Sequence, residues 1–226
     1  METKGKQSPH TRIPIKSSQL DESGVDLSPE WGFIYRQTVI KSFLTQMEIF
    51  DPGLLKHSRL VTHYTFLMAQ SLRFTPADEI ELLHSSLLYD LGMMGIDRRI
   101  QEKKGKLTPQ EWKVIHVHPQ NAGKILSVFP FLRKVIPIFR HHHEWCDGTG
   151  YPDGLMGEEI PFMSRITMIA DAFVAMTSDR PYRPSLTTDE ALEVIEKNKG
   201  VQFDPRLVPL VTTVVSEEPK SSSLQA

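Results

Sequence analysis

The sequence predicts an all-α protein, and three observations lead to this prediction. Apolar residues recur at three- and four-residue steps along most of the 226-residue chain, as they do on one face of a helix. Stretches that alternate between apolar and polar residues, typical of half-buried strands, are not found. Finally, three predicted helix starts pair a capping hydroxyl with a proline that fits the first helical turn: Ser28-Pro29, Thr75-Pro76 and Thr108-Pro109.

The predicted helices follow one another closely. After Ser28, Trp31, Ile34 and Met47 belong to the apolar face of a first amphipathic helix of several turns. Eight further helices are expected, at residues 54–73, 76–91, 109–117, 120–128, 131–143, 161–177, 189–198 and 205–215. The remaining intervals at 92–107 and 144–160 are expected to be long loops, and the second is rich in glycine.

These elements give the expected domain organisation. Residues 1–27 and 216–226 are polar and lack periodicity, so we expect flexible tails there. Residues 28–52 would form an N-terminal helical extension, and residues 53–215 would form one main domain. With 39% hydrophobic residues, the chain is long enough to bury one substantial core.

Charge and cysteine content narrow the classes of partner and compartment. The net charge of -2 gives no overall basic field, which argues against a nucleic-acid polymer or an anionic membrane as partner. The single cysteine, Cys146, cannot form an intramolecular disulfide. The sequence shows neither a leader-like segment nor an apolar run long enough to cross a membrane, so we expect a cytoplasmic protein.

Six imidazole and carboxylate side chains lie within or beside the predicted helices, where they could converge on a metal. Such ligands suit iron, manganese, zinc or nickel, and the lack of cysteine ligands argues against a structural zinc site. In a helical bundle they would project inward from facing helices. The candidates are His57, Asp90, His118, His142, His143 and Asp171. His141 and Cys146 are expected to lie outside this set.

Several longer stretches resemble one known family. They are "LLYDLGMMGI", "KGKLTPQEWKVIHVHPQNAGKIL", "HHHEWCDGTGYPDGLMGEEIPFMSRITMIADAF", "TSDRPYR" and "FDPRLV". In this order they resemble the HD-GYP family of bacterial phosphodiesterases, which hydrolyse cyclic di-GMP. The resemblance covers roughly residues 53 to 213, and it is specific because Gly150-Tyr151-Pro152 occurs inside a long ordered series of matching segments.

The resemblance implies an HD-type helical domain around a buried centre of two transition-metal ions, commonly iron. Its ligand positions coincide with the six candidates, and Asp90 would bridge the two ions. Arg180 and Arg183 would bind phosphate oxygens through their guanidinium groups. The Gly150-Tyr151-Pro152 loop would lie at the lip of the cleft, touching substrate or a partner such as a diguanylate cyclase (GGDEF) protein. A rigid connector between helices is the alternative interpretation of this loop.

The sequence departs from the family pattern at four positions, all near the expected chemistry. Tyr89 stands where the family has the histidine of its His-Asp dyad, so the metal centre would be short of one ligand unless a tyrosinate binds. Gly53 replaces a glutamate that some members use for a third ion. Met93 replaces a lysine and Val174 a second aspartate, which removes two polar contacts.

Three functions therefore remain open. The first is a metal-dependent cyclic di-GMP phosphodiesterase whose turnover is lowered by Tyr89 and Met93. The second is a catalytically degenerate domain that binds cyclic di-GMP or docks signalling partners through its Gly150-Tyr151-Pro152 loop. The third is a different HD-type phosphohydrolase acting on nucleotides or phosphate monoesters, against which the long resemblance through "GYPDGLMGEEIP" argues.

Overall fold

The computed structural model describes residues 29–179 and 184–218. The chain divides into two compact units, Met1–Lys41 and Ser42–Ala226. The boundary falls inside the first helix, α1 (Pro29–Phe50), so the last turns of α1 belong to the second unit. Within that unit Phe43 packs edge-on against Phe129, with ring centroids 5.4 Å apart.

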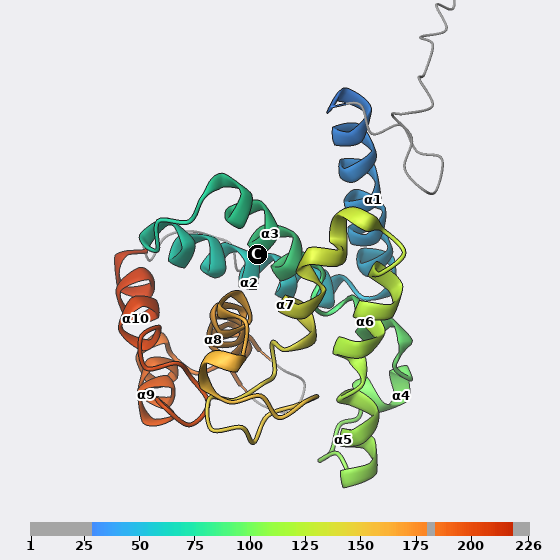
Figure 1. Ribbon diagram of the computed structural model, residues 1–226. Coiled ribbons are helices and arrows are strands. Elements are labelled where there is room, and N and C mark those ends of the chain that lie inside the picture. The colour runs from blue at the N-terminus through green and yellow to red at the C-terminus, as the bar shows by residue number, and fades with distance from the viewer. Residues whose placement is uncertain (1–28, 180–183, 219–226) are drawn as a thin grey trace, which may run out of the picture. The chain divides into compact units, whose positions relative to one another are not determined.

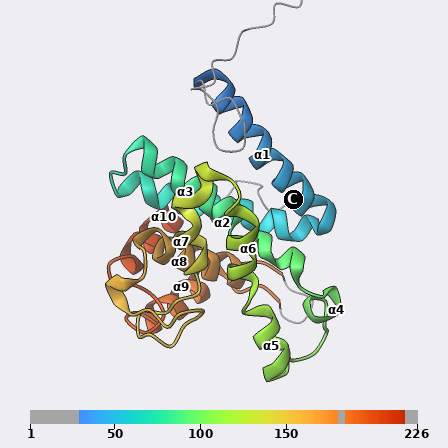
Figure 2. The same cartoon turned by 45° about the vertical axis from the view of Figure 1, so that its right-hand side comes forward.

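The second unit is built around a central helix, α8 (Phe162–Thr177), which is buried over most of its length. It contacts α2 (Pro52–Ser71), α7 (Ile136–Arg140), α9 (Thr188–Lys197) and α10 (Val208–Glu217). On its other side α2 packs against α3 (Pro76–Leu88), as Figures 1 and 2 show. This arrangement confirms the predicted all-α, HD-type bundle, and the described residues contain only one isolated β-bridge, between Lys199 and Phe203.

Short helical pieces complete the unit. A 3-10 helix, η2 (Leu91–Gly95), follows α3 and packs against α6 (His118–Leu126). The others are α4 (Arg98–Gln101), α5 (Pro109–Ile115), η3 (Pro130–Val135) and η4 (Gly157–Glu159). The interval 92–107, expected to be a loop, is therefore partly helical.

Two predicted helix starts are found as expected. The hydroxyls of Thr75 and Thr108 each accept a hydrogen bond from the backbone N–H three residues later. The side chains of Asp78 and Glu111 in turn accept one from the backbone N–H of the threonine, which completes a capping box at each helix start. The third, at Ser28, falls just outside the described residues.

The predicted helix 131–143 is wrong in its extent. Pro130 and Pro137 each lack a backbone N–H, so the segment divides into η3 and the short helix α7. After Arg140, the backbone N–H of His141 still binds the Pro137 carbonyl, but the imidazole of His142 binds the carbonyl of Phe139, an acceptor that a longer helix would have used. The paired histidines therefore lie in a turn, and this placement sets their direction.

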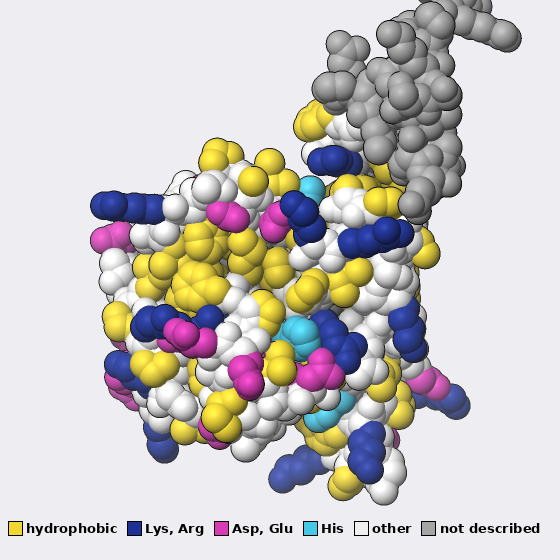
Figure 3. Space-filling view, in the orientation of Figure 1, with side chains coloured by type: hydrophobic (Ala, Val, Ile, Leu, Met, Phe, Trp, Pro, Cys, Tyr) yellow, Lys and Arg dark blue, Asp and Glu magenta, His cyan; other side chains and the backbone are white. Residues whose placement is uncertain are grey.

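The face seen in Figure 3 carries an apolar area surrounded by interspersed basic and acidic side chains. Among the helices of residues 29–179 and 184–218, none is both long enough and apolar enough to cross a membrane.

Candidate metal centre

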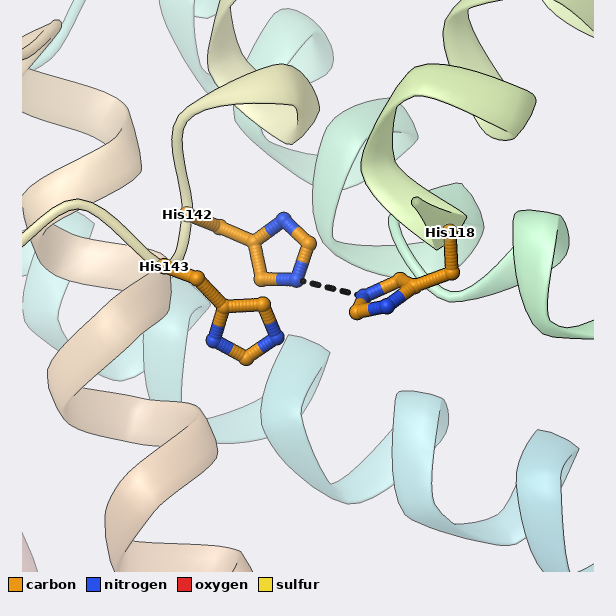
Figure 4. A group of neighbouring side chains, drawn as sticks. All are labelled: His118, His142 and His143. Atoms are coloured by element: carbon orange, nitrogen blue, oxygen red, sulfur yellow. Dashed lines mark hydrogen bonds between the residues drawn. The ribbon is translucent and has the colours of Figure 1, made fainter. Parts of the chain in front are cut away.

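Three histidines from two separate segments meet inside the second unit. His118 is the first residue of α6, while His142 and His143 lie in the turn after α7. One nitrogen from each lies within 4.8 Å of the others, and the rings point toward one another in Figure 4. Because His118 and His142 are almost fully buried, this is a closed site rather than a surface cluster.

The hydrogen bonds of two of these rings fix which nitrogen is free. His118 Nδ1 lies 2.8 Å from the carbonyl of Ile115, and His142 Nδ1 lies 2.5 Å from that of Phe139. A carbonyl can only accept, so both Nδ1 atoms carry the proton and both Nε2 atoms present lone pairs. These Nε2 atoms face each other at 3.4 Å. Two opposed lone pairs at this distance suit a shared cation, so the donors fit a metal ion.

The three imidazoles are held neutral. Burial lowers the pKa of His118 to about 4, partly opposed by its bond to the Ile115 carbonyl. Burial, together with the neighbouring His118, lowers the pKa of His142 to about 4. Burial and the other two histidines lower the pKa of His143 well below its usual value. Neutral imidazole is the form that binds metal, so the trio is ready to do so near neutral pH.

Asp90 adjoins this trio. It precedes η2 at the end of α3, and its Oδ1 lies 3.4 Å from His118 Nε2. Close approach of the backbones holds this geometry, because a Cβ at Gly92 would stand 1.9 Å from the carbonyl oxygen of His118. Only glycine lets η2 and α6 approach so closely, and the approach brings Asp90 beside the histidines.

His57 and Asp171 form a second group, joined by Tyr89. His57 Nε2 on α2 lies 2.7 Å from Asp171 Oδ1 on α8, and the Tyr89 hydroxyl donates to the same oxygen at 2.9 Å. Burial followed by the charges of Asp171 and Asp90 raises the Tyr89 pKa well above its usual value, so Tyr89 stays protonated. Burial opposes ionisation of Asp171, but the hydrogen bond with His57 outweighs it, and the Asp171 pKa lies below its usual range.

The Gly150-Tyr151-Pro152 loop lies against the centre rather than apart from it. The Tyr151 ring stacks on His116 and on His143, with ring centroids 3.8 Å and 4.8 Å away. A Cβ at Gly150 would come 2.2 Å from the amide nitrogen of Trp145, so only glycine fits where the loop crosses its own chain. Arg180 and Arg183, the expected phosphate-binding residues, lie outside the described residues.

Two residues near the centre escaped the sequence prediction. His116 lies in one of the matching stretches but was not selected as a site residue, and its stacking on Tyr151 becomes visible only in three dimensions. Glu144 is buried, and its carboxylate accepts hydrogen bonds from the amides of Asp153, Gly154 and Leu155 at 2.6–3.1 Å. An acidic residue directly before a glycine-rich turn was the available indication, since such turns expose amides in need of acceptors.

A second trio of possible ligands, His141, Glu144 and Asp153, already has other partners. Arg140 binds both oxygens of Asp153, at 2.7 and 2.8 Å, and the loop amides occupy Glu144. This trio ties the loop to the end of α7.

Comparisons with known proteins agree with this geometry. A family model described as an HD domain matches residues 46–207. The 3'3'-cGAMP-specific phosphodiesterase 3 of Vibrio cholerae is 32% identical over 204 residues, covering 88% of this chain and 44% of that protein. The cyclic di-GMP phosphodiesterase response regulator RpfG of Xanthomonas campestris is 36% identical over 165 residues, covering 72% of this chain and 43% of that protein. The chain thus spans less than half of these relatives.

Solved structures share the fold. The cyclic GMP-AMP specific phosphodiesterase V-cGAP3 of V. cholerae aligns with a TM-score of 0.63 at 20% identity, covering 83% of this chain and 50% of that chain. The HDG"Y"P protein Bd1817 of Bdellovibrio bacteriovorus aligns with a TM-score of 0.57 at 19% identity, covering 71% of this chain and 51% of that chain.

Proposed function

The chain belongs to the HD domain family, and we propose that within it the protein is a metal-dependent cyclic-dinucleotide phosphodiesterase of the HD-GYP type. The observation that carries the proposal is the buried trio His118, His142 and His143, with opposed Nε2 atoms 3.4 Å apart and Asp90 alongside. The substrate class follows from relatives at 32% and 36% identity, which are phosphodiesterases of 3'3'-cGAMP and of cyclic di-GMP.

Each residue has a proposed role in phosphodiester hydrolysis. Bound transition-metal ions, with iron as our first expectation and manganese, zinc or nickel as alternatives, would activate water and neutralise phosphoryl charge. His118, His142 and His143 supply the neutral lone pairs, and Asp90 supplies negative charge beside them. His57 and Asp171 are the remaining proposed ligands, which the resemblance assigns to a second ion. The proposed role of Arg180 and Arg183 is to bind the phosphate oxygens.

A turnover assay tests the proposal. Protein loaded anaerobically with Fe²⁺ or Mn²⁺ is incubated separately with cyclic di-GMP and 3'3'-cGAMP, and linear dinucleotide and mononucleotide are separated by chromatography. We expect product from at least one substrate and none from His142→Ala. The matched control is His63→Ala, because His63 pairs with Glu218, outside the proposed site. Absence of product from metal-loaded wild type, beside an active phosphodiesterase as reference, would contradict the enzymatic proposal.

The alternative is a degenerate domain that binds a cyclic dinucleotide, or a partner such as a GGDEF protein, without hydrolysis. It is favoured by three of the four departures, because Met93 and Val174 offer no charged group and the Tyr89 hydroxyl donates to Asp171. Calorimetry with cyclic di-GMP separates the two functions. Saturable binding without product supports the sensor, and binding with product supports the enzyme.

A further inference from the structure

We propose that the centre holds a single metal ion, on the side of His118, His142, His143 and Asp90, and that Tyr89 occupies the side where a second ion would bind. This inference rests on the proposed metal dependence of the function and departs from the two ions that the family resemblance implies.

The candidate ligands divide into two unequal groups. The donor atoms of His118, His142 and His143 lie within 4.8 Å of one another. Among residues 29–179 and 184–218, no group of three or more such donors includes His57 or Asp171. Apart from Asp90, which lies 3.4 Å from His118 Nε2, the second side therefore offers two histidine or carboxylate donors, whereas a protein metal site usually takes at least three.

The two donors of that side are also engaged with each other. His57 Nε2 lies 2.7 Å from Asp171 Oδ1, and the Tyr89 hydroxyl donates to the same oxygen at 2.9 Å. With two hydrogen bonds, both lone pairs of Oδ1 are used. A second ion bound to His57 and this oxygen would have to break at least one of these bonds.

Tyr89 is held in this position by its surroundings. Its side chain is almost fully buried, and its ring packs edge-on against His142, with centroids 4.7 Å apart. A ring packed in this way cannot swing aside without opening a cavity in the core. A phenol that donates its proton to Asp171 is not at the same time a metal ligand. Tyr89 therefore replaces a ligand by a hydrogen-bond donor and fills the adjacent space.

A single ion changes what the site can do. Two-metal sites stabilise both the attacking and the leaving oxygen of a phosphodiester, while one ion still activates water and neutralises charge. The inference therefore gives the slow turnover expected from the sequence a physical cause.

Metal stoichiometry tests the inference independently of activity. Wild type and four variants are loaded with Mn²⁺ under anaerobic conditions and desalted, and metal per chain is measured by mass spectrometry. Electron paramagnetic resonance distinguishes an isolated ion from an exchange-coupled pair. We expect about one ion per chain in wild type, with the spectrum of an isolated ion.

The variants assign that ion to one side. Tyr89→Phe keeps the ring and should keep one ion, while Tyr89→His restores a nitrogen ligand and should bind two with a coupled spectrum. His57→Ala should retain the ion, and His142→Ala should lose it. Circular dichroism and thermal melts check that each variant is folded.

Every outcome is decisive. Two ions in wild type, loss of the ion in His57→Ala, or a single ion in folded Tyr89→His would overturn the inference while leaving the proposed phosphodiesterase intact. No bound ion would overturn the inference and the metal-dependent function together. One ion without any turnover would support the inference and contradict the enzymatic proposal.

Discussion

The Tyr151 ring lies face to face with the imidazole of His116, at a centroid distance of 3.8 Å and an interplanar angle of 11°. It also stacks on His143, at 4.8 Å and 27°. The loop that contains Tyr151 thus packs through its largest side chain on a histidine of the candidate metal centre. A role in shaping the centre follows from these contacts, whether or not the loop also meets a partner.

Shortening Tyr151 should therefore damage both stability and metal binding. Tyr151→Ala removes a largely buried ring and should lower the free energy of unfolding by about 3 kcal/mol. It should also weaken Mn²⁺ binding several-fold, because His143 loses the surface that orients it. Tyr151→Phe keeps the stacked ring and should stay within about 1 kcal/mol of wild type. Urea denaturation and Mn²⁺ titration measure the two effects, and equal behaviour of both variants would contradict this role.

Glu144 should stabilise the loop, because its buried carboxylate accepts hydrogen bonds from three backbone amides. Glu144→Gln keeps the size but turns an N–H₂ group toward amide donors, and should lower the free energy of unfolding by about 2 kcal/mol. The matched control is Glu159→Gln in the same loop. The Glu159 carboxylate accepts a hydrogen bond from the exposed Met156 amide, and this substitution should lower the free energy of unfolding by less than about 1 kcal/mol. Chemical denaturation compares them, and similar losses would show that the buried amides do not depend on Glu144.

Local features of the fold could be predicted from the sequence, and contacts between distant segments could not. The helix starts at Thr75-Pro76 and Thr108-Pro109 depend on neighbouring residues, so the pattern was visible in the chain itself. The end of α7 was missed because a local competition decides it. There the His142 imidazole binds the Phe139 carbonyl, which periodicity alone assigns to a longer helix.

For the candidate site too, local chemistry could be predicted and contacts between distant segments could not. Histidine and aspartate could be selected from their chemistry and from a family resemblance, and the structure brings His118, His142 and His143 together. Their roles as ligands stay predictions. The bond from Tyr89 to Asp171 spans 82 positions and depends on how α3 and α8 each pack against α2, so the sequence left open whether Tyr89 ligates a metal. Arg180 and Arg183 stay predictions from the resemblance alone.

Gly92 should tolerate no side chain. A Cβ there would come 1.9 Å from the His118 carbonyl oxygen and 2.7 Å from the Ala122 amide nitrogen, so α6 would have to move. Gly92→Ala should lower the free energy of unfolding by about 3 kcal/mol and weaken Mn²⁺ binding, because His118 begins α6. Gly105→Ala is the control, since nothing lies within 4 Å of its Cβ, and it should change stability by less than about 0.5 kcal/mol. A stable Gly92→Ala variant with unchanged Mn²⁺ affinity would show that the close approach of η2 and α6 does not position His118 in the metal centre.

The buried histidines should make the metal-free protein sensitive to mild acid. His118 and His142 have pKa values of about 4 in the folded chain, against 6.5 for an ordinary histidine. Between these values the unfolded chain binds more protons than the folded one. The free energy of unfolding therefore reaches its full value above pH 6.5 and falls as the pH is lowered toward 4. At about 1.4 kcal/mol per pKa unit, each histidine accounts for a loss of about 3 kcal/mol at pH 4.

Urea denaturation of chelator-treated protein at half-unit steps from pH 7.5 to 4 measures this loss. His118→Asn provides the control, because its amide can still donate to the Ile115 carbonyl but does not titrate, so its stability should fall less steeply with acid. Bound Mn²⁺ should move the onset of the loss to lower pH, since the ion binds only the unprotonated rings. An unchanged free energy of unfolding between pH 7 and 5 in the metal-free protein would mean that these imidazoles are not held neutral by burial.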